Sequence, residues 1–133
     1  MDQISEIDGV EYDRDLPLFD GDHFSGVFDP ENPDARKSLL LEIFGLFREE
    51  CGSRVEAVER FFGQAADTVY RENIHFIAGS AANLGMARLA GLCRGVEQAI
   101  IVGRTFDLSA CRVALRREYE SSCEAFSADP LVR

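Results

Sequence analysis

The sequence predicts an all-α protein, an antiparallel up-down four-helix bundle with a short extra helix on its N-terminal side. Three observations support this fold class. Apolar residues recur in steps of three and four along most of the chain, as on one face of an amphipathic helix. Proline is scarce, and the alternation that marks half-buried strands is absent. The apolar segments are joined by short connections, which place consecutive helices antiparallel.

The first elements are a short helix around Asp20–Phe28 and a long helix over residues 33–64. Phe24, Val27 and Phe28 form the apolar side of the short helix. Asn32 is a suitable N-cap and Pro33 suits the first position of the long helix. One continuous helix is the preferred interpretation, with a kink at Gly52 as the alternative. Its apolar stripe comprises Leu40, Phe44, Phe47, Cys51, Val55, Val58, Phe62 and Ala65.

Three further helices follow. One begins near Ala66–Asp67 and closes at Gly85, which suits the left-handed position after a helix end. The next covers about 86–102, and the last about 108–127 with Asp107 as its N-cap. Their apolar stripes are Tyr70, Ile74, Ile77, Ala81 and Leu84, then Leu89, Leu92, Cys93, Val96 and Ile100, then Leu108, Cys111, Leu115, Tyr119, Ser122 and Phe126.

The net charge of −10 lies in the N-terminal quarter, because residues 1–34 contain 11 of the 24 acids and a single base. We therefore divide the chain into an acidic, irregular segment over residues 1–19 and a bundle domain over residues 20–130. A solvated tail is the preferred interpretation of the acidic segment. The rest of the chain is balanced in charge and has no basic stripe, so nucleic acid is not an expected partner.

Composition also bears on location. No apolar run approaches the ~20 residues that a membrane-spanning helix needs, and the acidic N-terminus is unlike a targeting signal. A cytoplasmic monomer without membrane association is the expectation. Cysteines 51, 93, 111 and 123 form no CxxC pair, so we expect reduced core residues and no zinc site.

His75 is the candidate functional residue. It lies in mid-helix, one residue past the apolar stripe, at the edge of the core. Its neighbours Ala78, Gly79 and Ala82 are small, and a helix-interior glycine costs about 1 kcal/mol relative to alanine. An approaching partner or phosphoryl group would explain this cleared face. An ordinary surface histidine is the competing interpretation, and His23 is expected to be a surface or end-cap residue.

The helix that follows offers His75 a partner. Antiparallel pairing about the turn near Gly85 brings residues 94–97 alongside His75, among them Arg94 and Glu97. A carboxylate on one imidazole nitrogen would fix the tautomer, raise the basicity of the other nitrogen and steady an imidazolium. The alternative is an exposed Glu–Arg pair of little consequence.

These residues form a recognisable pattern. The stretch His75-Phe-Ile-Ala-Gly-Ser-Ala-Ala-Asn-Leu-Gly85, followed by Leu89, Cys93 and Glu97, resembles the signature of histidine phosphotransfer (HPt) domains. That signature is His, two residues, usually Lys, then Gly-Ser, with Ala-Asn-Leu-Gly closing the helix. The resemblance is close over residues 71–100, and helix order and lengths agree over about 20–127.

The resemblance implies a function. His75 would be the phosphoacceptor of a two-component phosphorelay, Glu97 would orient its imidazole, and Gly79 would give access. The partners would be response-regulator receiver domains and a sensor histidine kinase, hybrid or not. The protein would be a phosphocarrier rather than an enzyme, with no cofactor of its own and with Mg²⁺ in the receiver domain.

One position departs from the signature, because Ala78 stands where the family usually has Lys. We expect Arg94 to replace part of that charge through a phosphoryl contact. Because this Lys is missing, a second hypothesis is a degenerate bundle that binds a receiver or kinase without transferring phosphate. A di-iron bundle, suggested by the Glu-x-x-His of Glu72 and His75, and an ordinary structural bundle are weaker hypotheses.

Overall fold

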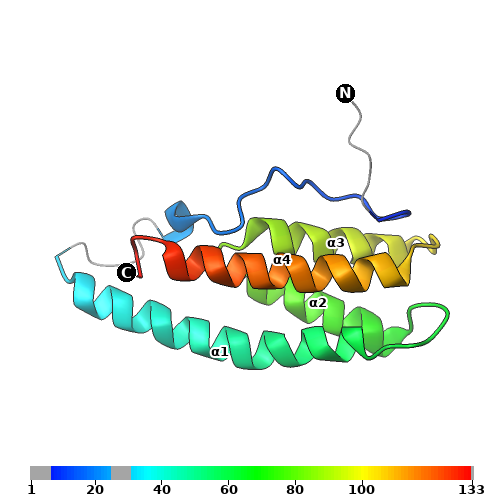
Figure 1. The fold of residues 1–133 in the computed structure, drawn as a ribbon, viewed down its shortest axis with the longest axis horizontal. Helices are drawn as coiled ribbons and strands as arrows, with labels where there is room; N and C mark the ends of the chain where they lie inside the picture. Colours follow the sequence, from blue (N-terminus) through cyan, green and yellow to red (C-terminus); the bar gives the residue numbers. More distant parts are fainter. Residues whose placement is uncertain (1–6, 25–30, 133) are drawn as a thin grey trace.

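Four helices lie side by side in the computed structural model, which describes residues 7–24 and 31–132 (Figure 1). They are α1 (Pro33–Glu59), α2 (Thr68–Asn83), α3 (Ala87–Ile101) and α4 (Leu108–Ala128). Consecutive helices run in opposite directions, and α4 returns to pack beside α1. The described residues contain no named strand. The predicted fold class, an antiparallel four-helix bundle, is confirmed.

Polar side chains cap the N-terminal ends of α1, α2 and α4. Asn32 accepts a hydrogen bond from the Ala35 N–H at 3.3 Å, and Asp107 accepts one from the Ala110 N–H at 3.0 Å, as predicted. Asp67 does the same for α2, with its carboxylate 2.8 Å from the Tyr70 nitrogen. Gly85 has a φ of 76°, the left-handed conformation expected of it just past the end of α2.

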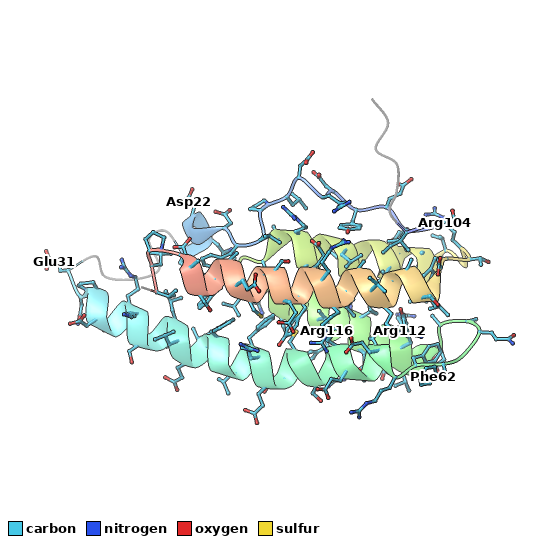
Figure 2. All side chains as sticks on the ribbon, in the orientation of Figure 1. Asp22, Glu31, Phe62, Arg104, Arg112 and Arg116 are labelled. Carbon is cyan, nitrogen blue, oxygen red and sulfur yellow. The ribbon has the colours of Figure 1, made fainter. Side chains whose placement is uncertain are left out.

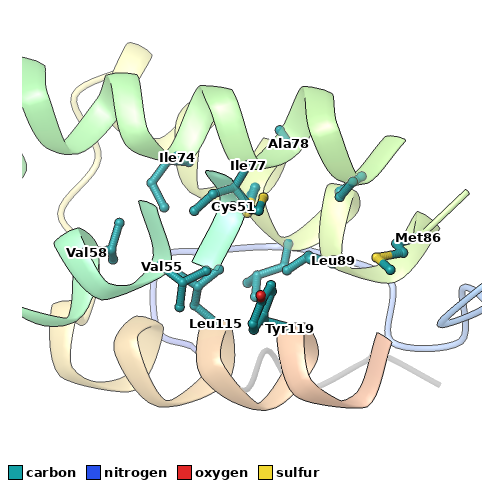
Figure 3. Close-up of a cluster of buried hydrophobic side chains, with 14 of the residues drawn as sticks. Cys51, Val55, Val58, Ile74, Ile77, Ala78, Met86, Leu89, Leu115 and Tyr119 are labelled. Atoms are coloured by element: carbon teal, nitrogen blue, oxygen red, sulfur yellow. The ribbon is translucent and has the colours of Figure 1, made fainter. Parts of the chain in front are cut away.

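The core lies between the four helices and contains most of the predicted apolar stripes (Figure 3). The α1 stripe is buried without interruption from Leu40 to Val58 in a helix that is continuous through Gly52. Aromatic rings fill the end of the bundle around Phe126, which stacks on Phe44 at 4.3 Å between ring centroids. All four cysteines are free and buried, in agreement with the prediction of small core residues.

The end of α1 differs from the prediction. The helix ends at Glu59 rather than near residue 64, and Phe62 is 82% exposed (Figure 2). Phe61 turns inward instead and packs on Tyr70 with ring centroids 5.0 Å apart. The side chain of Arg112 on α4 donates to the Phe61 carbonyl at 2.9 Å, which holds the chain in its turn towards α2. Ala65 is likewise exposed, so the last two positions of the predicted stripe are wrong.

The predicted short helix at 20–28 is a single 3₁₀ turn, η1 (Gly21–Phe24), as far as the structure describes it; Val27 and Phe28 lie outside the described residues. His23 is exposed, and its Nε2 lies 3.0 Å from the Asn83 carbonyl oxygen. It therefore caps the C-terminal end of α2, which agrees with the end-cap role expected from the sequence.

Residues 7–17, here called the N-terminal strap, correct the expectation of a solvated tail. The strap runs along the bundle beside α3 and α4 (Figure 1), and Ile7 and Val10 are fully buried in the same core as the helices. The Asp107 N–H donates to the Asp8 carbonyl at 3.0 Å, and the Arg88 N–H donates to the Pro17 carbonyl at 3.0 Å. The acidic side chains of the strap do face solvent, namely Asp8, Glu11, Asp13 and Asp15.

Candidate functional site

The structure brings His75 and Glu97 together. His75 projects from the middle of α2, and its imidazole Nδ1 lies 2.7 Å from Glu97 Oε2 on α3. The His75 side chain is 74% exposed, whereas the Glu97 side chain is 17% exposed. The extensive packing of α2 against α3 fixes this register, which follows from the short turn at Gly85.

This arrangement determines what the imidazole can do. A carboxylate accepts hydrogen bonds, so an ionised Glu97 holds the proton on Nδ1. The Nε2 lone pair then points away from Glu97, and no residue that the structure describes forms a hydrogen bond with it. The pair is thus an exposed nitrogen nucleophile on a ring of fixed orientation, next to a carboxylate that stabilises positive charge on that ring.

Only part of the small-residue face is open. A Cβ built on Gly79 would meet no atom within 4 Å, so packing among the residues that the structure describes does not require a glycine there. Ala78, by contrast, is 4% exposed and belongs to the core, and Ala82 is partly buried. Small side chains at these two positions allow the close packing of α2 on α3. Gly79 is therefore the one small residue of this face that packing among the described residues does not explain.

A cleft beside His75 contains two arginines that sequence reasoning missed. It has a volume of about 500 Å³, and Arg54 from α1 and Arg71 from α2 line it together with His75 and Glu97. Arg71 precedes His75 by one helical turn, a spacing that could have identified it. Arg54 lies on a different helix, and no local pattern gives the register between α1 and α2.

Arg94 does not line this cleft. It is exposed and lies one turn from Glu97 along α3, where it lines a separate hollow with Asp20, His23 and Ala82. Its contact with a phosphoryl group on His75 therefore stays a prediction.

Metal ligands do not gather in the described part of the chain. Within residues 7–24 and 31–132, no group of three or more His, Cys, Asp or Glu side chains could hold a metal ion. Glu72 and Glu97 both line the cleft of His75, but the second Glu-x-x-His that a di-iron site needs is not among the residues that line it. No helix in the described ranges has the length and apolar character needed to cross a membrane.

An up-down bundle that presents one carboxylate-held, solvent-facing histidine from mid-helix has the form of a histidine phosphotransfer domain. The family model of the Hpt domain matches residues 42–129, so the chain belongs to the Hpt domain family. Members of this family are phosphocarriers in phosphorelays rather than enzymes, and they interact with receiver domains and histidine kinases of two-component systems. No curated protein and no solved structure matches the chain.

Proposed function

We propose that this protein relays a phosphoryl group between receiver-domain aspartates, with His75 Nε2 as the atom that carries it. The observation that supports this most strongly is the exposed imidazole held at 2.7 Å by Glu97 beside the open space at Gly79. A nucleophile with a fixed tautomer and free access is what a transfer between two proteins requires, because the partner must bring its phosphate to the nitrogen.

The transfer step is a displacement at phosphorus. The Nε2 lone pair forms a bond to the phosphorus of an aspartyl phosphate, and the bond from phosphorus to the aspartate oxygen breaks. The aspartate leaves as a carboxylate with the electron pair. The proton on Nδ1 stays in place, so the phosphorylated ring is an imidazolium that the Glu97 carboxylate stabilises. A second aspartate reverses the step, since a positively charged ring is a good leaving group.

The receiver domain supplies the remaining chemistry in this proposal. A receiver domain would supply Mg²⁺ and a cationic side chain to neutralise the phosphoryl oxygens, and this chain would need no cofactor of its own. Gly79 gives the receiver access, Glu97 positions the ring, and a sensor histidine kinase is the original source of phosphate. The protein acts in the cytoplasm as a monomer, without contact to nucleic acid or membrane.

Phosphate transfer to a His75→Gln variant tests the proposal. Receiver domains are loaded with acetyl phosphate and Mg²⁺, then mixed with the parent protein, with His75→Gln and with the control His23→Gln. The parent and the control should gain phosphate that is labile to acid and stable to base, whereas His75→Gln should gain none. Helix content should be unchanged in His75→Gln, because the side chain is largely exposed.

Label on His75→Gln would contradict the assignment. A parent protein that binds a receiver domain and accepts no phosphate from any donor would instead support the degenerate bundle, which the absence of the family's usual Lys at Ala78 favours.

A further inference from the structure

The proposed phosphohistidine would carry two negative charges close to the surface of α2, and the family's usual cation is absent beside it. Ala78 occupies that position and is 4% exposed. A phosphoryl group held between two proteins is stabilised by cations that donate hydrogen bonds to its oxygens. The charge must therefore come from the partner alone or from other residues of this chain.

The cleft of His75 lies where such a group would sit. Side chains of a helix lean towards its N-terminus, so the His75 imidazole leans over the turn that contains Arg71 and Glu72. Both of those residues line the cleft with His75. Two acids, Glu72 and Glu97, and two arginines, Arg54 and Arg71, are its charged groups besides His75. Glu97 is already engaged with the ring at 2.7 Å.

Arg54 is held in place before any phosphate arrives. Its Nη1 donates to Asn73 Oδ1 at 3.0 Å, and its guanidinium carbon lies 4.5 Å from the centre of the Phe76 ring. Asn73 is 7% exposed, so the acceptor of this hydrogen bond is buried, whereas Arg54 itself is exposed. The hydrogen bond uses one of the five N–H donors of a guanidinium and leaves the others available. Less conformational freedom is lost when an anchored arginine binds an anion.

Arg71 is available as well. Neither Arg71 nor Arg54 forms a salt bridge with any residue in the described part of the chain, whereas Arg116 pairs with both Glu59 and Glu120. Arg94, the residue expected from the sequence, faces the hollow of Asp20 and His23 instead. An arginine in a cleft with few acids is the better candidate for an incoming anion.

We propose that Arg54 and Arg71 form a phosphoryl-binding pair that replaces the missing family Lys, with each guanidinium donating to oxygens of the group on His75. This inference rests on the proposed function of His75. Arg54 brings one of the two charges from α1, so that α1 contributes directly to a site otherwise built from α2 and α3, and Arg71 brings the other from α2 itself.

The experiment measures the loading of His75 and the ionisation of the phosphoryl group that it carries. The variants are Arg54→Gln, Arg71→Gln and the two together. Arg48→Gln is the matched control, because Arg48 is also an α1 arginine beside a phenylalanine ring, 5.9 Å from the centre of Phe44, and does not line the cleft. Arg94→Gln tests the competing source of charge. Phosphoramidate serves as a donor that brings no protein cation, and a phosphorylated receiver domain serves as the second donor.

The double variant should be loaded by phosphoramidate about tenfold more slowly than the parent, equivalent to ~1.4 kcal/mol. In ³¹P NMR titrations its phosphohistidine should also show a raised phosphoryl pKa, because nearby cations favour the dianion. Arg48→Gln should match the parent in both measurements, and adding Ala78→Lys to the double variant should restore part of the rate.

A double variant with the parent's loading rate and phosphoryl pKa would overturn the inference, as would an effect confined to Arg94→Gln. Failure of the parent protein to accept phosphate from either donor would instead count against the proposed function of His75.

Discussion

At the scale of single residues, two positions that have no side chain are as informative as the side chains of the site. Two glycines in the helices next to the site have opposite surroundings. A Cβ on Gly79 would meet nothing within 4 Å, whereas a Cβ on Gly95 would overlap the Glu11 carbonyl oxygen. The second glycine leaves room for the strap, and we propose that the first leaves room for a partner. The sequence alone does not distinguish them.

Gly79→Gln should separate folding from docking. A Cβ at this position meets no atom of the described residues within 4 Å, and Gln is a better helix former than Gly, so the free energy of unfolding should rise by up to about 1 kcal/mol. Transfer from a receiver domain should fall sharply, because the side chain enters the space beside His75.

Gly45→Gln is the control. Gly45 is also exposed in a helix interior with no atom within 4 Å of a built Cβ, and it lies nine residues before Arg54, on the opposite side of α1. It should gain similar stability in urea denaturation and transfer phosphate normally. Equal transfer by both variants would remove the access role of Gly79.

The residues of the site differ in how far the sequence could predict them. His75 and Glu97 follow from one helical stripe and one short antiparallel turn, and the structure places them 2.7 Å apart. Arg54 could not be predicted in this way. Its position depends on where α1 ends and on the course of the connection to α2, which is set by tertiary contacts such as that of Arg112 with the Phe61 carbonyl.

At the scale of elements, periodicity predicted which helices form better than where they end. Residue 62 keeps the phase of the α1 stripe, yet the helix has already ended at Glu59 and Phe61 fills the space against Tyr70. The strap was missed for a different reason. Ile7 and Val10 are isolated apolar residues among acids, and an irregular segment has no period from which their burial could be predicted.

Gly95→Ala should detach the strap. The new methyl group would overlap the Glu11 carbonyl, which is backbone and cannot rotate away, so the strap must move. Full burial of a Val or Ile side chain stabilises a protein by about 1.5–3 kcal/mol. Ile7 and Val10 are fully buried, and part of their contribution to stability would be lost. We expect the free energy of unfolding in urea to fall by about 1–3 kcal/mol and amide exchange to become faster over residues 7–17.

Gly45→Ala is the control, and this variant should be slightly stabilised. Equal stability of the two variants would show that the strap contributes little.

At the scale of the whole molecule, the strap and the four helices share one core, and their charges are arranged around it. The excess of acids lies in residues 1–34, and the exposed acids of the strap place part of that charge along α3 and α4. Three of the helices contribute buried thiols to this core: Cys51 lies on α1, Cys93 on α3, and Cys111 and Cys123 on α4. The reactivity of these thiols therefore measures how well the core stays closed.

The native protein should resist thiol reagents until it unfolds. Burial raises the pKa of Cys51 from 9.0 to about 12 and that of Cys123 to about 11, and it also raises the pKa values of Cys93 and Cys111. Because the thiolate is the reactive species, an aromatic disulfide reagent at pH 8 should label none of the four thiols quickly in the native protein and all of them in guanidinium.

The same shifts determine how stability depends on alkaline pH. A thiol whose pKa is raised by folding keeps its proton in the folded state at pH values where the unfolded chain has lost it. Its contribution to stability is therefore complete below about pH 9 and is lost as the pH rises towards 12, the folded value of Cys51. Cys51→Ala should reduce this alkaline loss, measured as the shift of the urea midpoint between pH 8 and pH 10.

The labelling experiment has its own contrary outcome. Rapid labelling of one thiol in the native protein at pH 8 would reveal local opening of its helix, and the core would then not unfold as a single unit.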